Sequence, residues 1–403
     1  MEEKKNCFRI RWRGGKIMAN HDFKIQLREW RYHLHKYPET AFEEKKTSAY
    51  LAMELKKMGL DVHENIGGTG IVANLTVGDG EGVIGLRADM DALNLNEVKD
   101  HAYRSQHPGK MHACGHDGHM TNLLGAAKLL SDRKNFNGTV RFIFQPAEEI
   151  GKGAQAMIDD KLFERFPIEE IYGLHNMPGL PAGTIHTRPG PIMASEDNFV
   201  IRIKGKGAHA SSPHMSIDPL VIAAEIILAL QTIVARNLDP VDTAVVSCTE
   251  LHTDGIRNAI PSNVVIKGDT RSFKPEVQQL LEDRMRKLCE GICAMHGADC
   301  EFDYTHEFSP TINWEECNKI ATLAAQNTVG HINTNSEGSP FMASEDFGKF
   351  LETIPGCFVF LGTKEDHTEE IIPLHNSLYD YNDDVLKTGA EFFAELVKIR
   401  LPK

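Results

Sequence analysis

The sequence lacks an uninterrupted apolar run of the roughly 18 residues that a membrane-spanning helix needs. Its first residues also lack the apolar segment of a secretory signal peptide. Both absences argue against membrane insertion and export. We therefore expect a cytoplasmic protein without a membrane partner.

An excess of positive charge is absent as well. The chain carries 44 Lys and Arg against 57 Asp and Glu, which gives a formal net charge of −13. Nucleic acids and anionic lipids attract basic surfaces, so neither is expected as a partner. Small molecules are the expected partners.

Paired cysteine motifs are the third absence. The eight cysteines are scattered along the chain and none forms a Cys-x-x-Cys pair. In a long chain without an export signal, this distribution favours reduced thiols over a disulfide framework.

The length of 403 residues is sufficient for two or three domains. Residues 1–17 are charged and show no apolar period, so we expect them to form a disordered extension. Apolar residues at helical spacing predict helices over residues 22–35 and 43–58.

Apolar strands then alternate with helices, which predicts an α/β layer domain. Residues 71–77 and 83–88 read as strands, and the glycine-rich residues 78–82 between them predict that the two are antiparallel neighbours. Residues 139–144 and 170–174 read as buried strands.

The pattern changes after about Met193, where strands and helices follow the order β-α-β-β-α-β. This is the ferredoxin-like order, which can form a compact domain. The predicted elements are strand 198–206, helix 219–235, strands 243–251 and 262–271, helix 275–295 and strand 299–306. We predict a domain over 194–307 that is inserted into a first domain made of 18–193 and 308–403.

The run from His112 to His119 holds three imidazoles, one thiol and one carboxylate. Thiolate and imidazole are ligands that suit zinc and its neighbours among the transition metals. Helical spacing follows the run, which places it on a loop before a helix. A metal site is the functional interpretation, and a polar turn rich in histidine is the alternative.

Further candidate ligands follow separate predicted strands. Glu148 and Glu149 come after the strand that ends at Phe144, and His175 follows Leu174. His375 lies near the C-terminus. Each could be an ordinary surface or core residue, but loops at one end of an α/β sheet commonly build a site together.

Seven ordered motifs resemble the hippurate hydrolase and auxin-conjugate amidohydrolase branch of the aminoacylase-like metallopeptidases. The similarity extends over roughly residues 22–397. It implies an α/β fold of two domains, a mixed-sheet catalytic domain and an inserted ferredoxin-like lid. The motifs lie at residues 87–93, 112–119, 145–149, 174–178, 205–211, 342–347 and 374–377.

The resemblance also implies two divalent metal ions, for which zinc, manganese, cobalt and nickel remain open. It implies Cys114 as the bridging ligand, Glu148 as the general base and Asp89 as a residue that orients a ligand. The other implied ligands are His116, Glu149, His175 and His375. Wider relatives carry an aspartate at Cys114, and a His-x-Asp pair where this chain has Arg87-Ala88-Asp89.

Two residues of the inserted domain, His209 and Asn258, match family positions that reach an active site, often across a dimer, and help to hold an oxyanion. Each could instead only cap its own turn. Arg271 could bind a substrate carboxylate or pair with Asp269. A homodimer or higher homo-oligomer through the inserted domain is therefore expected.

Together these features predict a metal-dependent amidohydrolase that cleaves N-acyl amino acids, hippurate-like or otherwise acylated, with Glu148 taking a proton from water. A deacetylase of an N-acetyl amino-acid intermediate and a dipeptidase are alternatives on the same scaffold. A non-catalytic metal-binding protein is the alternative from another class.

Overall fold

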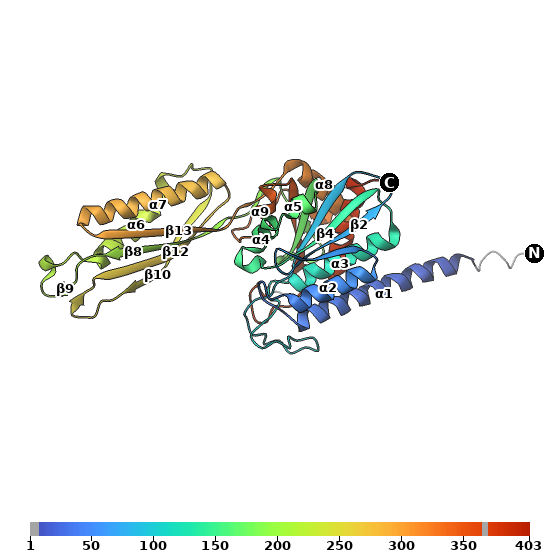
Figure 1. The fold of residues 1–403 in the computed structure, drawn as a ribbon, viewed down its shortest axis with the longest axis horizontal. Coiled ribbons are helices and arrows are strands. Elements are labelled where there is room, and N and C mark those ends of the chain that lie inside the picture. Colours follow the sequence, from blue (N-terminus) through green and yellow to red (C-terminus); the bar gives the residue numbers. More distant parts are fainter. Residues whose placement is uncertain (1–7, 365–369) are drawn as a thin grey trace, which may run out of the picture. The chain divides into compact units, whose positions relative to one another are not determined.

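The computed structural model describes residues 8–364 and 370–403 (Figure 1). The chain divides into two compact units. Unit 1 comprises Met1–Pro189, Asn313–Gly338 and Phe350–Lys403, and unit 2 comprises Gly190–Ile312 and Ser339–Lys349. Unit 2 thus contains the range 194–307 and also residues 339–349, which the sequence analysis assigned to the first domain.

The N-terminal region differs from the expectation of a disordered extension over residues 1–17. Residues 1–7 lie outside the described residues, and helix α1 runs from Phe8 to Lys36. The predicted helix 22–35 forms only the second half of this longer helix.

Unit 1 is built on a sheet of eight strands in the order β1-β2-β4-β3-β5-β16-β6-β15. Four neighbouring strands at its centre, β4, β3, β5 and β16, run parallel to one another. The strands are β1 (Asp61–Ile66), β2 (Gly70–Val77), β3 (Val83–Asp89), β4 (Gly138–Gln145), β5 (Glu170–Pro181), β6 (Ile185–His186), β15 (Thr334–Asn335) and β16 (Gly356–Lys364).

The central strands are rich in buried residues because both faces of the sheet are covered. In β16 every residue except Lys364 is buried. This continuous burial is typical of a parallel strand with helices on both sides. The structure confirms the predicted α/β class, a mixed sheet with a second, antiparallel unit.

The prediction that strands 71–77 and 83–88 pair with each other is wrong. Strand β4 lies between β2 and β3, antiparallel to β2 and parallel to β3. The glycine-rich link passes the entry of β4 instead of closing a hairpin, and Oδ1 of Asn137 accepts the N–H groups of Asp79 and Gly80 there at 2.9 and 2.8 Å. Strand β3 thereby gains a neighbour on each side.

Helices cover the sheet of unit 1. Helix α3 packs on α1, α10 and strand β3, and α8 packs on α10 and β16. The helices of unit 1, besides α1, are α2 (Lys45–Lys57), α3 (His116–Arg133), α4 (Gly153–Asp159), α5 (Leu162–Arg165), α8 (Glu315–Val329) and α10 (Leu386–Arg400), with short 3₁₀ turns at Glu148–Ile150, His331–Asn333 and Asp383–Val385. Helix α9 (Gly348–Leu351) lies at the boundary between the units.

Unit 2 has an antiparallel sheet in the order β10-β12-β8-β13. Its chain order is β-α-β-β-α-β, as the sequence predicts. The elements are β8 (Glu196–Lys204), α6 (Pro219–Arg236), β10 (Ala244–Thr253), β12 (Asn263–Ser272), α7 (Pro275–His296) and β13 (Asp299–Phe308), with short strands β7 (Gly190–Met193), β9 (Ala208–His209), β11 (Ala259–Ile260) and β14 (Thr311–Asn313) and a 3₁₀ turn at Pro213–Met215.

Helix α6 is long and apolar enough to cross a membrane by length and composition alone, which the sequence analysis does not anticipate. Its inner face is nevertheless part of the core of unit 2, where Ile222, Ile226 and Ile233 are buried. The Asp218 side chain accepts the Leu220 N–H at 3.0 Å and caps the helix.

Candidate metal centre

The candidate ligands of unit 1 come from segments at the carboxyl ends of its parallel strands. Asp89 ends β3, Glu148 and Glu149 follow β4, and His175 lies at the middle of β5. Side chains at this edge of an open α/β sheet face a common crevice, particularly where neighbouring connections run in different directions.

Cys114 and His116 flank a turn that opens helix α3. Gly115 between them has φ +92°, a conformation that residues with a Cβ rarely adopt. A Cβ there would lie 2.5 Å from Oδ1 of Asn176. Glycine therefore lets the loop approach β5, and both candidate ligands are buried.

Glu148 and Glu149 lie on a strained turn. Ala147 before them has φ +53°, a left-handed conformation that costs about 1–2 kcal/mol for a residue other than glycine. Asp91 accepts the N–H groups of Glu148 and Glu149 at 3.0 and 3.1 Å, one through each carboxylate oxygen. These bonds fix the backbone from which both glutamates project.

His375 reaches the same group from the far end of the chain. Its backbone N–H donates to the Ala113 carbonyl at 2.9 Å, and its φ is +59°. Its Nε2 lies 3.4 Å from Oε2 of Glu149. Two residues separated by more than 200 positions are thereby placed side by side.

The predicted ligands form overlapping groups whose ligand atoms lie within 4.8 Å of one another. The groups are Cys114, His116 and His175; Cys114, Glu149 and His375; and His116, Glu148 and Glu149. Sγ of Cys114 lies 3.5 Å from Nε2 of His175. The structure thus brings together every metal-ligand candidate of the sequence analysis and places Glu148 beside them.

The hydrogen bonds leave ligand nitrogens facing inward. Nδ1 of His116 lies 2.8 Å from the Asp91 carbonyl, and Nδ1 of His175 lies 2.7 Å from that of Asn176. Since a carbonyl only accepts, each Nδ1 carries the proton and each Nε2 has a lone pair for an ion.

Two buried polar atoms among the candidate ligands are evidence for a cation site. Nε2 of His116 and Oε1 of Glu149 have no hydrogen-bond partner among the described residues, and they lie 3.8 Å apart. Burial, with Asp91 and Asp89 nearby, raises the pKa of Glu149 to about 7. A divalent ion would satisfy both atoms and favour the charged carboxylate, so the thiolate, imidazole and carboxylate donors fit such an ion.

Asp89 lies at the edge of this group. It accepts from Nη1 of Arg87 at 2.8 Å and contacts Nδ1 of His119 at 2.6 Å, while its Oδ2 lies 3.8 Å from Nε2 of His116. Burial opposes ionisation, yet the facing His116, His119 and Arg87 hold the pKa of Asp89 well below its usual range.

Asp91 is the residue that sequence reasoning missed. It contacts His116 through its carbonyl and both glutamates through its carboxylate. The available signal was its place two residues after Asp89, beyond the end of β3. A second missed residue is Asn176, whose Oδ1 lies 2.5 Å from Nε2 of His119.

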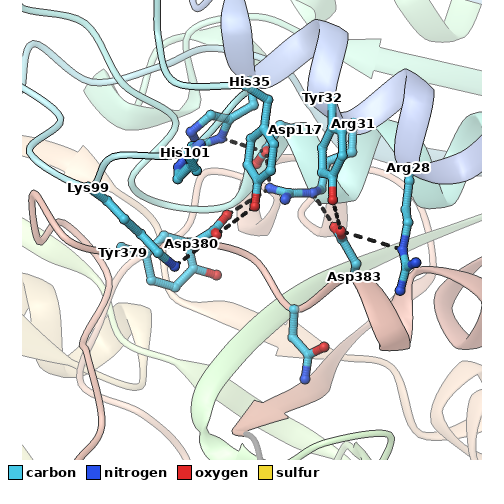
Figure 2. A network of polar contacts seen from close by, with 12 residues as sticks. Arg28, Arg31, Tyr32, His35, Lys99, His101, Asp117, Tyr379, Asp380 and Asp383 are labelled. Atoms are coloured by element: carbon cyan, nitrogen blue, oxygen red, sulfur yellow. Dashed lines mark hydrogen bonds and ion pairs between the residues drawn. The ribbon is translucent and has the colours of Figure 1, made fainter.

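A network of charged side chains, several of them on α1, supports the turn that opens helix α3 (Figure 2). Arg31 lies among three aspartates, at 3.1 Å from Asp117, 3.0 Å from Asp380 and 2.5 Å from Asp383. His35 contacts Asp117 through Nδ1 at 2.9 Å. Because Asp117 directly follows His116, this network holds the first turn of α3.

The remaining candidates lie in unit 2. The β9–β11 ladder pairs His209 with Ala259, and the Ala210 N–H donates to the Asn258 carbonyl at 3.0 Å, so the exposed His209 and Asn258 are neighbours. The Ser211 N–H donates to Nδ1 of His209 at 3.1 Å, which leaves the proton on the outward Nε2.

Arg271 is engaged by carboxylates of its own unit. Its Nε lies 2.6 Å from Asp269 and its Nη1 lies 2.8 Å from Glu196. This is the pairing that the sequence left open as the alternative to substrate binding.

Comparison with known proteins agrees with this fold. Residues 85–399 match the peptidase family M20/M25/M40. The chain belongs to this family, and it is an enzyme that hydrolyses amide bonds.

Two relatives and one structure illustrate the similarity. Hippurate hydrolase of Campylobacter jejuni is 40% identical over 93% of this chain and 96% of its own length. An IAA-amino acid hydrolase (ILR1-like 4) of Arabidopsis thaliana is 35% identical over 94% and 87%. The crystal structure of the Bacillus subtilis YXEP protein, a dinuclear metal binding peptidase, has a TM-score of 0.81 at 36% identity and covers 94% of this chain and 99% of its own.

Proposed function

We propose that this enzyme hydrolyses the amide bond of N-acyl amino acids and releases a carboxylic acid and a free amino acid. The observation that carries the proposal is the cluster of ligand atoms around Cys114 with Glu148 beside it. The names of the relatives, a hippurate hydrolase and an IAA-amino acid hydrolase, support this substrate class.

Two divalent ions would be held by the donor set of Cys114, His116, Glu149, His175 and His375. When bound, such ions lower the pKa of water and polarise an amide carbonyl. Thiolate and imidazole ligands favour zinc, cobalt or nickel more than an all-oxygen site does, while manganese stays in the set to be tested.

Glu148 acts as the general base in this proposal. The residue is 6% exposed, and its Oε2 lies 3.8 Å from Nε2 of His116. It takes a proton from the water whose oxygen attacks the carbonyl carbon. When the C–N bond breaks, Glu148 returns this proton to the departing amine nitrogen. Asp91 holds the backbone of Glu148 during both transfers.

His209 and Asn258 are proposed to donate to the developing oxyanion. The orientation of His209 supports this role, because Ser211 occupies Nδ1 and leaves an Nε2–H donor on an exposed side chain. Arg271 is proposed to hold Asp269 and Glu196 within unit 2 rather than to bind a substrate carboxylate.

Unit 2 is also proposed to carry a homodimer contact. On the outward face of α6, Leu220, Val221 and Leu228 are 41%, 59% and 72% exposed. Helix α6 packs next to β10, an edge strand of its sheet. Clustered exposed apolar residues next to an open edge are typical of an interface.

A substrate panel tests the function. Purified enzyme loaded separately with zinc, manganese, cobalt or nickel is assayed with hippurate, N-acetyl amino acids, indole-acetyl amino acids and free-amine dipeptides. We expect turnover of N-acyl amino acids. Turnover of dipeptides alone would overturn the proposal, and so would tight metal binding with no hydrolysis of any of these amides.

A further inference from the structure

Two buried glutamates precede helix α2, and only one of them caps it. Oε2 of Glu39 accepts the N–H groups of Lys46 and Thr47 at 2.8 and 2.9 Å and the Thr47 hydroxyl at 3.1 Å. Glu44 occupies the position just before the helix but makes no side-chain hydrogen bond to its first turn. The Glu44 carboxylate is therefore available for another partner.

That partner is Ala147, which lies 103 residues further along the chain in the turn that carries Glu148. Oε1 of Glu44 accepts the Ala147 N–H at 3.0 Å, and Oε2 accepts the Thr69 hydroxyl at 2.5 Å. Glu44 is fully buried, and burial raises its pKa to about 6. The carboxylate is thus still ionised at neutral pH, where it is a stronger acceptor than a neutral oxygen.

Three successive backbone N–H groups, those of Ala147, Glu148 and Glu149, are held by two buried carboxylates, Glu44 and Asp91. Ala147 is the left-handed residue of this turn. Such a conformation persists only where the surroundings impose it. The bond from Glu44 holds the N–H of this strained residue, while its carbonyl accepts the N–H groups of Lys152 and Gly153 at 3.3 and 3.1 Å.

We propose that Glu44 is a positioning residue for the general base: by fixing the N–H of Ala147 it sets the direction in which the Glu148 carboxylate projects. This inference rests on the proposed role of Glu148. Displacement of a reacting group by about 1 Å can cost on the order of 100-fold in rate. We therefore expect loss of Glu44 to lower kcat by about 10-fold to 100-fold.

The test compares Glu44→Ala and Glu44→Gln with Glu39→Gln as the matched control. All are assayed with hippurate as metal-loaded enzymes, with metal content and thermal unfolding measured on the same samples. We expect a lower kcat with KM and metal content close to wild type in both Glu44 variants. Gln keeps a carbonyl oxygen for Ala147, so Glu44→Gln should retain more activity than Glu44→Ala. The Glu39 control should lower thermal stability without the fall in kcat.

Hydrogen exchange gives a readout that does not depend on activity. In metal-loaded protein, Glu44→Ala should accelerate amide exchange in peptides that cover residues 145–153, and Glu39→Gln should accelerate exchange at the start of α2. Equal exchange in residues 145–153 for wild type and Glu44→Ala would overturn the inference.

The double variant with Glu148→Gln separates this inference from the proposed function. If Glu148 is the base, Glu44→Gln should cause little further loss in the Glu148→Gln background. An equal fold-loss in both backgrounds would show a general structural role and overturn the inference. Full activity of Glu148→Gln alone would instead overturn the proposed function, and the exchange of residues 145–153 would still report whether Glu44 holds the turn.

Discussion

Arg31 donates through Nη1 to Oδ2 of Asp117 at 3.1 Å, and both side chains are almost completely excluded from solvent. Removing one partner of a buried ion pair leaves an uncompensated charge. We expect Arg31→Met to lower the free energy of unfolding by about 3–5 kcal/mol. Urea denaturation measures this change.

Arg28, one turn earlier on α1, gives the matched control. Its side chain is 47% exposed and pairs with Asp384, which is 77% exposed, at 3.0 Å, with a longer contact of 3.6 Å to Asp383. Arg28→Met should change the free energy of unfolding by about 0–1 kcal/mol. Similar losses in the two variants would contradict the distinction between the buried and the exposed pair.

His35 makes stability depend on pH. Burial disfavours its charge, but Asp117 and Glu97 raise its pKa to about 9 in the folded protein, against about 6.5 in the unfolded chain. Since the folded state holds the proton more tightly, the stabilisation of about 3 kcal/mol is complete below pH 6.5 and is lost as the pH rises through 9. His35→Gln should flatten this part of the stability profile.

Urea denaturation between pH 6 and pH 10 measures the profile. His33→Gln is the control on the same helix, because burial lowers the pKa of His33. The control should keep the downward slope between pH 6.5 and 9. A slope that persists unchanged in His35→Gln would show that another group is responsible.

Glu148→Gln should remove turnover while preserving the ions. General base catalysis contributes typically about 10²–10⁴-fold, and the variant keeps the shape of the side chain. We expect kcat to fall by that order with wild-type metal content. Glu149→Gln, at the next position, should lose metal instead, because it changes a ligand. If Glu148→Gln lost metal and Glu149→Gln lost only turnover, the roles of the two glutamates would be exchanged.

Cys114→Asp should change metal preference. A carboxylate is a harder ligand than a thiolate, so affinity should shift from zinc towards manganese. The measurement is removal of metal with a chelator, followed by titration with each ion and assay on hippurate. Cys114→Ala serves as the control and should bind each ion more weakly. An unchanged ratio of zinc affinity to manganese affinity in Cys114→Asp would argue against ligation by Cys114.

Leu228→Glu tests the dimer contact on α6. A charge at a residue that is 72% exposed should not disturb the fold of a monomer. In a dimer it would bury an unpaired carboxylate and weaken association strongly. Light scattering after size exclusion measures the mass of wild type and variant. A wild-type monomer, or an equally stable variant dimer, would contradict the proposed contact.

Most of the elements were accessible from the sequence because period and composition are local. The predicted elements of the inserted domain differ from the observed ones by at most two residues at either end. The pairing of β2 with β4 was not accessible, since it depends on where α3 returns the chain. Because β2 and β3 are adjacent in sequence, a hairpin was predicted. In the structure β3 instead pairs with β4 on one edge and with β5 on the other.

The site shows the same limit. The candidate ligands Cys114, His116 and Glu149 could be identified from the sequence, because thiolate, imidazole and carboxylate groups bind metals whatever the fold. The role of Asp91 depends on backbone N–H groups that lie 57 and 58 residues away. Likewise, nothing near Glu44 in sequence indicates that Glu39 caps α2 and leaves Glu44 for another turn. Such roles follow from tertiary contacts alone.

The position of β16 between β5 and β6 has a consequence for biosynthesis. Roughly 180 residues separate the end of β5 from the end of β16. At translation rates of about 5–20 residues per second, the edge of β5 that pairs with β16 in the folded protein stays open for about 10–40 s during synthesis. An open strand edge is a template for aggregation, so nascent chains in this interval are the state in which a chaperone is most needed.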